Sequence, residues 1–456
     1  MDSTLGCVAA WMPRQRWYAG KGRVPSLHLV AWWDMSSDDP GARVRTYLLV
    51  DEGALPPVLY QVPVVERETV AVTADPDHVI GSPEPGTTLI DGPFDPAYTR
   101  ALERLVTEGG ECTGPAARAV GHPEGERVDG SPRSAQVLTG EQSNTSVVFR
   151  GDADALICKI YRQVNGGLNP DIELSSALSA AGSPYVPRAV GALEGTWPHP
   201  SDPSRTITGS LAFAQQFLAG VEDAWRVALR AAADGEAFDR EAFELGEATA
   251  NVHGSLSELF PTRAATPDDR DATVQAWARR LAIAIAEVPA ITDLKEAVET
   301  VYAAASQLAW PRLQRIHGDF HLGQVLLVPH RGWVLLDFEG EPLRPMRERV
   351  LPDLALRDVA GMLRSFDYVA GSLRLDDPDR PPDVPLRWAR SARDEFVRGY
   401  AAGSGEGLDD VGILLAALEL DKAVYESIYE ARNRPTWVAI PLRAIERLVV
   451  RLDGFR

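Results

Sequence analysis

Residues 316–327, IHGDFHLGQVLL, and residues 333–340, WVLLDFEG, decide the fold of this chain. Each stretch joins acids or amides to an apolar run that is typical of a buried strand. Asp319 lies in a Gly-containing loop, Gln324 follows it, and Asp337 ends the second apolar run. An aspartate, an amide and a second aspartate in this order are typical of proteins that transfer phosphoryl groups.

The three polar side chains have complementary roles in that chemistry. Asp319 can accept a hydrogen bond from a substrate hydroxyl and orient it for in-line attack, as a catalytic base. Gln324 offers a neutral oxygen and Asp337 an anionic one, and Mg²⁺ prefers such hard oxygen ligands. The alternative is that the two aspartates merely cap turns. The combined pattern favours phosphoryl transfer with Mg²⁺ held by Gln324 and Asp337.

A lysine in an upstream strand supplies the next part of a kinase. Lys159 lies in the apolar run 155–161, ALICKIY, where its stem is buried and its ammonium needs an anion. A phosphate of ATP and a carboxylate on the following helix would both serve. Glu173 is the expected carboxylate partner, and Asp171 competes with it. A surface lysine on an ordinary strand is the alternative.

A polar turn before that strand is the expected phosphate-binding loop. Residues 137–149, VLTGEQSNTSVVF, have the pattern of strand, turn and strand. Ser143, Asn144 and Thr145 can direct backbone amides and side chains at ATP phosphates. Most stretches of this kind are ordinary hairpins, so the turn supports the kinase prediction only together with the lysine and the two aspartates.

Length and charge restrict the partners and the compartment. The chain has 456 residues and a formal net charge of −19, which argues against nucleic acid or an anionic membrane as the main partner. Cys7, Cys112 and Cys158 form neither a disulfide framework nor a CxxC metal site. Neither a signal peptide nor a long apolar span is visible. We therefore expect a cytoplasmic protein.

The pattern along the chain predicts an α+β protein with two lobes. Residues 27–72 are expected to form an antiparallel meander, 81–94 a connector and 95–108 a helix. Further strands are expected near 135–139, 146–150, 155–161 and 209–220, with a helix at 169–180. The later part is predominantly helical, and only 314–338 interrupts it with two short strands. The helices expected there span 222–233, 239–260, 267–288, 291–309, 354–371, 387–402, 409–431 and 441–452.

Seven motifs spread over nearly the whole chain carry a resemblance to a known family. They are RQRWYAGKGR (14–23), EQSNTSV (141–147), NPDIEL (169–174), HGDFHLGQVL (317–326), LLDFEGEP (335–342), LRDVAGMLRSF (356–366) and ELDKAVYE (419–426). The chain resembles the actinobacterial maltokinases and the related glucosamine kinases. Both belong to the aminoglycoside-phosphotransferase-like superfamily, which shares a two-lobed fold with protein kinases.

This resemblance implies a domain organisation and a set of roles. An N-terminal cap is expected at 1–110, a kinase N-lobe at 111–219 and a helical C-lobe at 220–456. Asp319 is the implied base, Gln324 and Asp337 the implied Mg²⁺ ligands, and Lys159 the implied ATP phosphate ligand, positioned by Glu173. Gln324 stands where many relatives have Asn, and it keeps the amide oxygen that a metal needs.

The identity of the sugar depends on the helix around 418–432. Glucosamine brings an ammonium that Asp421 or Glu426 could bind, whereas maltose brings hydroxyls and a second ring that could stack on Tyr425 or Trp437. His321 is a further candidate for contact with the substrate. A solvated, salt-bridged helix is the alternative for this face. We expect glucosamine to be phosphorylated to glucosamine 6-phosphate, with maltose to maltose 1-phosphate as the alternative.

Two other functions stay open at this point. The chain could be a catalytically idle relative that binds nucleotide or sugar and acts through contacts, with RQRWYAGKGR as an interaction surface. Packing of that motif against the N-lobe is the simpler interpretation. Aminoglycosides could be the acceptor instead of a simple sugar. The oligomeric state is open, with a monomer favoured.

Overall fold

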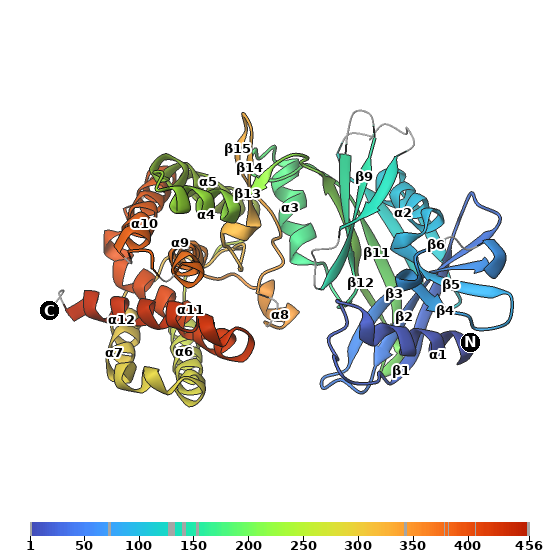
Figure 1. Cartoon of the computed structure of the whole chain (residues 1–456), viewed down its shortest axis with the longest axis horizontal. Helices are drawn as coiled ribbons and strands as arrows, with labels where there is room; N and C mark the ends of the chain where they lie inside the picture. Colours follow the sequence, from blue (N-terminus) through green and yellow to red (C-terminus); the bar gives the residue numbers. More distant parts are fainter. Residues whose placement is uncertain are drawn as a thin grey trace. The chain divides into compact units, whose positions relative to one another are not determined.

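The computed structural model describes residues 2–71, 74–125, 133–138, 143–151, 155–341, 344–377, 379–381, 383–405 and 407–453. The chain divides into two compact units (Figure 1). The first unit comprises Met1–Ala180 and Pro187–Ala219, and the second comprises Ala181–Val186 and Gly220–Arg456.

The first unit begins with an antiparallel sheet in the order β1-β2-β3-β5-β4. Its strands are β1 (Leu27–Met35), β2 (Ala42–Asp51), β3 (Val58–Glu68), β4 (Val79–Gly81) and β5 (Thr87–Asp91). The pairing of β1 with β2 and of β2 with β3 confirms the expected meander. The prediction of a connector at 81–94 is wrong in part, because Thr87–Asp91 form strand β5, which pairs with β3. Leu89 and Ile90 of β5 are both buried.

The motif RQRWYAGKGR packs into this part of the unit. Trp17 contacts Trp11 at the end of α1 (Asp2–Trp11), with ring centroids 5.6 Å apart, and it also contacts Tyr60, at 5.8 Å. Tyr18 donates a hydrogen bond to Asp51 at 2.9 Å. Trp17 and Tyr18 are 5% and 1% exposed, and the guanidinium of Arg162 lies 4.8 Å from the centre of the Trp17 ring, so Trp17 packs against the N-lobe as predicted. Helix α1 itself was not predicted.

A second sheet of the first unit has the order β6-β7-β11-β12-β10-β9-β8. Its strands are β6 (Gly110–Thr113), β7 (Arg118–Pro123), β8 (Ser134–Val137), β9 (Asn144–Arg150), β10 (Ala155–Tyr161), β11 (Ala189–His199) and β12 (Asp202–Gln216). Helices α2 (Pro96–Glu108) and α3 (Pro170–Ala180) were predicted, whereas β6, β7 and β11 were missed. One hydrophobic core joins both sheets and α2, and it includes Trp33, Leu102, Phe149 and Trp197.

A buried ion pair and a glutamine link the two sheets. Arg162, directly after β10, lies 2.8 Å from Asp91 at the end of β5, and its Nε donates to Thr145 Oγ1 at 2.8 Å. The side chains of Arg162 and Asp91 are 0% and 2% exposed. Gln61 of β3 donates to the backbone oxygens of Tyr161 and Leu211, each at 3.0 Å. These polar contacts hold the cap sheet in position against the second sheet.

The second unit is mainly helical, as predicted. Its helices are α4 (Ala224–Asp234), α5 (Asp239–Leu259), α6 (Pro267–Glu287), α7 (Lys295–Ser306), α8 (Met346–Arg349), α9 (Leu356–Asp376), α10 (Asp383–Ser404), α11 (Gly412–Asn433) and α12 (Ala439–Asp453). Helix α9 lies in the middle of the other helices (Figure 1) and is buried over most of its length. The two short strands expected within 314–338 are β14 (Val325–Val328) and β15 (Gly332–Leu335). They form a small sheet with β13 (Glu222–Asp223).

Cys7, Cys112 and Cys158 are free thiols, and the last two are buried. Within the described ranges, no helix is both long and apolar enough to span a bilayer.

Candidate active site

The backbone of the loop at 317–319 is held by a buried aspartate of α9. Asp358 accepts hydrogen bonds from His317 N at 2.8 Å and from Gly318 N at 2.9 Å. The ring of His253 on α5 also contacts Asp358, at 2.9 Å. Gly318 has φ of 86°, a left-handed conformation that favours glycine. The loop therefore has a fixed backbone before any ligand binds.

Close contact between this loop and α9 requires a second glycine. A Cβ atom at Gly361 would lie 2.5 Å from the backbone oxygen of Phe320, closer than such atoms approach. The ring of His317 contacts Leu336 O through Nε2 at 2.8 Å, and its Nδ1 accepts from Asp319 N at 3.4 Å. This arrangement requires the proton of the imidazole on Nε2, and it holds the backbone that leads into Asp319.

Asp319 presents its carboxylate beside one lysine of α11. The side chain is 23% exposed, and Oδ1 lies 3.4 Å from Lys422 Nζ. Lys422 also contacts Glu341 at 2.6 Å. A partly exposed carboxylate on a rigid loop can accept a hydrogen bond from a bound hydroxyl, as a catalytic base must.

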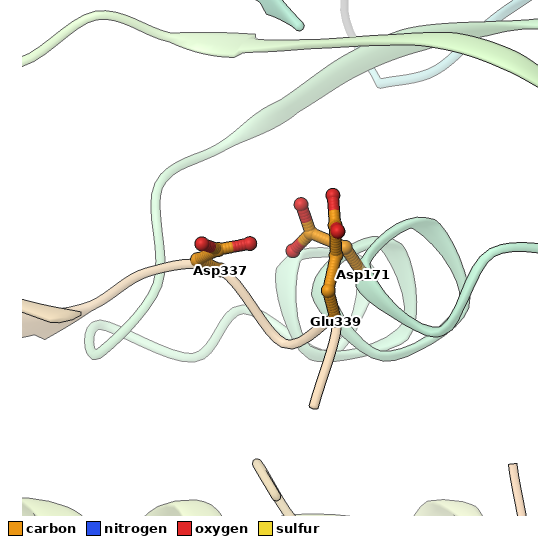
Figure 2. A group of neighbouring side chains, drawn as sticks. All are labelled: Asp171, Asp337 and Glu339. Atoms are coloured by element: carbon orange, nitrogen blue, oxygen red, sulfur yellow. The ribbon is translucent and has the colours of Figure 1, made fainter. Parts of the chain in front are cut away.

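The two expected metal ligands lie side by side. Gln324 Nε2 donates to Asp337 Oδ2 at 3.1 Å, and Leu336 N donates to Gln324 O at 2.9 Å. Pairing of β14 with β15 brings the two residues together. Asp337 has φ of 64°, a strained conformation for a residue other than glycine. Figure 2 shows Asp337 and Glu339 on the same stretch of chain after β15. The amide nitrogen of Gln324, and not its oxygen, faces Asp337 here, so the pair would hold Mg²⁺ only with the amide turned over, and its role as a metal site stays a prediction.

Lys159 has a carboxylate partner within the first unit. It lies centrally in β10, opposite Ser146 and Phe213, and its ammonium is 3.2 Å from Asp171. Asp171 is in the first turn of α3 (Figure 2), where its backbone N–H donates to Asn169 Oδ1 at 2.8 Å. The structure thus shows an ion pair with the competing carboxylate. The role of Glu173, which is half-buried in the same first turn of α3, stays a prediction.

The expected phosphate-binding turn is described only at its end, because residues 139–142 lie outside the described residues. Ser143 is exposed and Asn144 half-buried at the start of β9. Thr145 is 7% exposed, and its hydroxyl accepts a hydrogen bond from Arg162. Ser143 and Asn144 are therefore accessible to a ligand. The hydroxyl of Thr145 is occupied by a structural contact, and its role with ATP stays a prediction.

The acceptor residues expected on α11 are engaged by arginines. Asp421 pairs with Arg280 of α6, and its side chain is 4% exposed. Glu426 pairs with Arg364 of α9 at 2.8 Å, and its side chain is 12% exposed. Burial raises the pKa of both carboxyls, although the arginines act in the opposite direction. Both carboxylates are thus already paired with an arginine, and their role in binding the ammonium of a sugar stays a prediction.

Two other predicted substrate contacts have local surroundings of their own. His321 Nδ1 accepts from Gly323 N at 3.1 Å and so caps the short 3₁₀ helix Leu322–Gln324. Burial lowers the pKa of this imidazole. Tyr425 lines a cavity of about 20 Å³ together with Asp421 and Lys422. That volume is enough for a water molecule.

Sequence reasoning missed Lys422 and Glu341. Both lie inside motifs that were recognised, ELDKAVYE and LLDFEGEP, without a role. The available signal was a lysine on the buried face of a helix, four residues before Glu426. A lysine in that position requires an anion from another element.

The comparisons with known proteins define the class first. Residues 134–414 match the family described as the phosphotransferase enzyme family, and residues 11–95 match the maltokinase N-terminal cap domain. The chain therefore belongs to the phosphotransferase enzyme family. The predicted kinase class is confirmed, as is the presence of an N-terminal cap related to that of maltokinases.

Two characterised relatives are glucosamine kinases. The protein of Streptacidiphilus jiangxiensis is 30% identical over 336 residues, which cover 67% of this chain and 73% of that protein. The protein of Mycolicibacterium smegmatis is 29% identical over 336 residues, which cover 70% and 80%. The resemblance to the group of maltokinases and glucosamine kinases is thereby confirmed.

Solved structures of glucosamine kinase share the fold. Crystal form B has a TM-score of 0.71 and 23% identity, and covers 97% of this chain and 99% of that chain. A complex with glucosamine, ADP and inorganic phosphate has a TM-score of 0.68 and 22% identity, and covers 97% and 98%. The predicted α+β kinase-like fold is confirmed.

Proposed function

We propose that this protein is an ATP-dependent sugar kinase in which Asp319 orients the acceptor hydroxyl for attack on the γ-phosphate. The observation that carries the proposal is the fixed loop around Asp319. Asp358 binds the loop backbone, and the carboxylate of Asp319 remains 23% exposed beside Lys422. A rigid, accessible carboxylate is what in-line phosphoryl transfer requires of a protein.

The nucleotide and metal are assigned to the residues expected from the sequence. Lys159, held by Asp171, would bind ATP phosphates, and Ser143 and Asn144 are accessible at the start of β9. Gln324 and Asp337 would hold Mg²⁺. The metal would neutralise charge on the phosphates during transfer. Three free cysteines are consistent with action in the reducing cytoplasm.

Glucosamine is the acceptor that we propose first. The two relatives described above are named glucosamine kinases, and one of the similar structures is a complex with glucosamine. Phosphorylation of a free amino sugar at a hydroxyl needs the base at Asp319 and a pocket that accepts an ammonium. Asp421 and Glu426 are the carboxylates that we propose for that pocket, each already paired with an arginine.

Maltose is a second candidate with specific support. The cap at residues 11–95 matches the maltokinase cap domain. In addition, Arg280 and Arg364 already neutralise Asp421 and Glu426, which suits an uncharged acceptor better than a cation. Lys422 adds a positive charge directly beside Asp319. These charges disfavour an acceptor whose ammonium lies close to the reacting hydroxyl.

The decisive experiment measures ADP release with Mg²⁺-ATP and a panel of acceptors. Glucosamine, glucose, N-acetylglucosamine, maltose and kanamycin are compared, with Asp319→Asn as the test variant. We expect one sugar to dominate and Asp319→Asn to lower its kcat by about 10³-fold while ATP still binds. Asp293→Asn, which changes an exposed aspartate of the same unit, is the matched control and should leave kcat unchanged.

Each other outcome has a definite meaning. ATP binding without turnover on any sugar would favour the idle, ligand-binding alternative. Turnover on kanamycin above every sugar would favour an aminoglycoside acceptor. Full activity of Asp319→Asn would remove the base from the mechanism.

A further inference from the structure

We propose that Lys422 is a positioning residue for Asp319, and that Glu341 holds Lys422 in place. The inference rests on the proposed function, in which Asp319 is the base. It adds two residues, one from α11 and one from the segment after β15, to the machinery of phosphoryl transfer.

The geometry of the triad is asymmetric. Lys422 Nζ lies 2.6 Å from Glu341 Oε1 and 3.4 Å from Asp319 Oδ1. The short contact is a charge-assisted hydrogen bond, and the longer one is weak. Glu341 is therefore the anchor of the ammonium, and Asp319 is the carboxylate that the ammonium reaches. Catalytic hydrogen bonds are often long before substrate binds and shorten afterwards.

Burial makes this anchor strong. Glu341 is 8% exposed, and the side chain of Lys422 is 23% exposed. Burial alone would raise the pKa of Glu341, but Lys422 and Arg357 lower it to about 2. The carboxylates of Glu341 and Asp319 raise the pKa of Lys422, against the effect of burial. Both partners are thus charged throughout the neutral range.

Several other groups act on Asp319 besides Lys422. They include His317, His321, Arg349 and Tyr425. Burial lowers the pKa of both His321 and Arg349. The ammonium of Lys422 contacts the carboxylate of Asp319 directly, at Oδ1. Its position on Oδ1 leaves Oδ2 of Asp319 to accept the proton of a bound hydroxyl.

Removal of the ammonium should release the carboxylate of Asp319. Without Lys422, Asp319 can rotate away from the hydroxyl, and one positive charge no longer favours its ionised form. We therefore expect a fall in kcat with little change in the KM for ATP, because Lys159 and the phosphate-binding strands belong to the other unit. A lysine that only stabilised the fold would instead lower the amount of active protein and leave the pH profile unchanged.

The test compares Lys422→Met, Lys422→Arg and Lys295→Met in steady-state assays on the preferred sugar. Lys422→Met should lower kcat about 100-fold and move the acid limb of kcat/KM to higher pH. Lys422→Arg, which keeps the charge, should retain about a tenth or more of the wild-type kcat. Lys295→Met removes an exposed lysine of α7 that pairs only at the surface, and it should behave as wild type.

A second variant keeps the test valid if Lys422→Met does not fold. Lys422→Met with Glu341→Gln removes both buried charges and leaves neither unpaired. It should fold and show the same loss of kcat and the same shift of the acid limb. Wild-type kcat and pH profile in either variant would overturn the proposal. Asp319→Asn separates failure of the proposed function from failure of the role of Lys422. If Asp319→Asn is inactive while Lys422→Met keeps wild-type activity, only the role of Lys422 fails.

Discussion

Each unit contains a charge cluster in which a cation lies against carboxylates, and the two clusters differ in their exposure to solvent. In the first unit, Arg162 and Asp91 are 0% and 2% exposed, and their closest atoms are 2.8 Å apart. In the second unit, Lys422 and Asp319 are each 23% exposed and 3.4 Å apart. The first cluster is closed within the core that joins two sheets, whereas the second leaves a carboxylate that a substrate can reach.

The difference teaches how to separate a structural ion pair from a functional one. Both clusters combine a cation, a carboxylate and a neighbouring hydrogen-bonding group, so residue types alone do not distinguish them. Arg162 uses donors on Asp91 and Thr145, and its side chain is 0% exposed. Lys422 uses its short contact on Glu341 and keeps only a long one to Asp319. Exposure and asymmetry of the contacts are therefore the two features on which our proposal assigns a functional role to the cluster at Lys422.

The largest effect on stability is expected from Arg162→Met. This change leaves Asp91 buried without its cation, and such a loss costs about 3–5 kcal/mol. Burial already raises the pKa of Asp91, so its charge is poorly tolerated without a partner. Denaturant unfolding of the first unit measures the effect, and kcat at a low temperature should stay close to wild type.

Arg43→Met is the matched control for that variant. Arg43 pairs with Asp34 on the same unit, but the side chains are 55% and 42% exposed. Its removal should change the unfolding midpoint very little. A similar loss of stability in both variants, or a selective loss of kcat in Arg162→Met, would contradict the contrast between a closed and a reachable cluster.

A smaller and pH-dependent effect is expected from Glu341→Gln. Lys422 and Arg357 outweigh burial and lower the pKa of Glu341 to about 2, below its ordinary value of 4.5. A depressed carboxyl pKa stabilises the fold above the unfolded pKa, and this stability is lost as the pH falls through the folded pKa. Glu341→Gln should thus be less stable than wild type by about 1–3 kcal/mol near neutrality. The difference should shrink between about pH 5 and pH 2.

Thermal melts of the two proteins across that pH range measure the difference. Gln keeps the size of the side chain, so packing is matched in the pair. A stability difference that is constant from neutral to acid pH would mean that the charge of Glu341 does not stabilise the second unit.

The part of the site that sequence predicted is local in the chain. Gln324 and Asp337 are 13 residues apart, on either side of the hairpin of β14 and β15, and a strand-turn-strand pattern already places them together. The same holds for the loop at Asp319, whose glycine and histidines are its sequence neighbours. Short-range patterns fix such geometry, because a hairpin brings its two ends side by side.

The acceptor face could not be predicted in the same way. Asp421 and Arg280 are 141 residues apart, and Lys422 and Asp319 are 103 apart. Helical spacing tells which side chains of α11 share a face, but the neighbours of that face depend on how the helices pack. The sequence pattern could therefore not reveal that Asp421 and Glu426 are each paired with an arginine of another helix.

Strand β11 shows why part of the fold was missed. It contains Gly191, Gly195 and Pro198, which weaken the sequence pattern of a strand. The glycines have a tertiary cause: a Cβ at Gly191 would lie 2.0 Å from Val106 O, and one at Gly195 would lie 2.7 Å from Leu211 Cδ1. Close packing on α2 and β12 selects residues that local propensity disfavours.

The smallest effect on stability and on kcat is expected from Arg432→Met. Arg432 belongs to a solvent-exposed ion pair and lies on the same helix as Lys422. Arg432 Nε lies 2.8 Å from Glu287, and the side chains are 59% and 28% exposed. Solvent screens such a pair, so Tm should stay within about 2 °C of wild type and kcat should not change. Because Lys422→Met and Arg432→Met each remove one cation from α11, their kcat values isolate the effect of position. A loss of kcat in Arg432→Met as large as that in Lys422→Met would mean that the net charge of α11, and not contact with Asp319, controls the reaction.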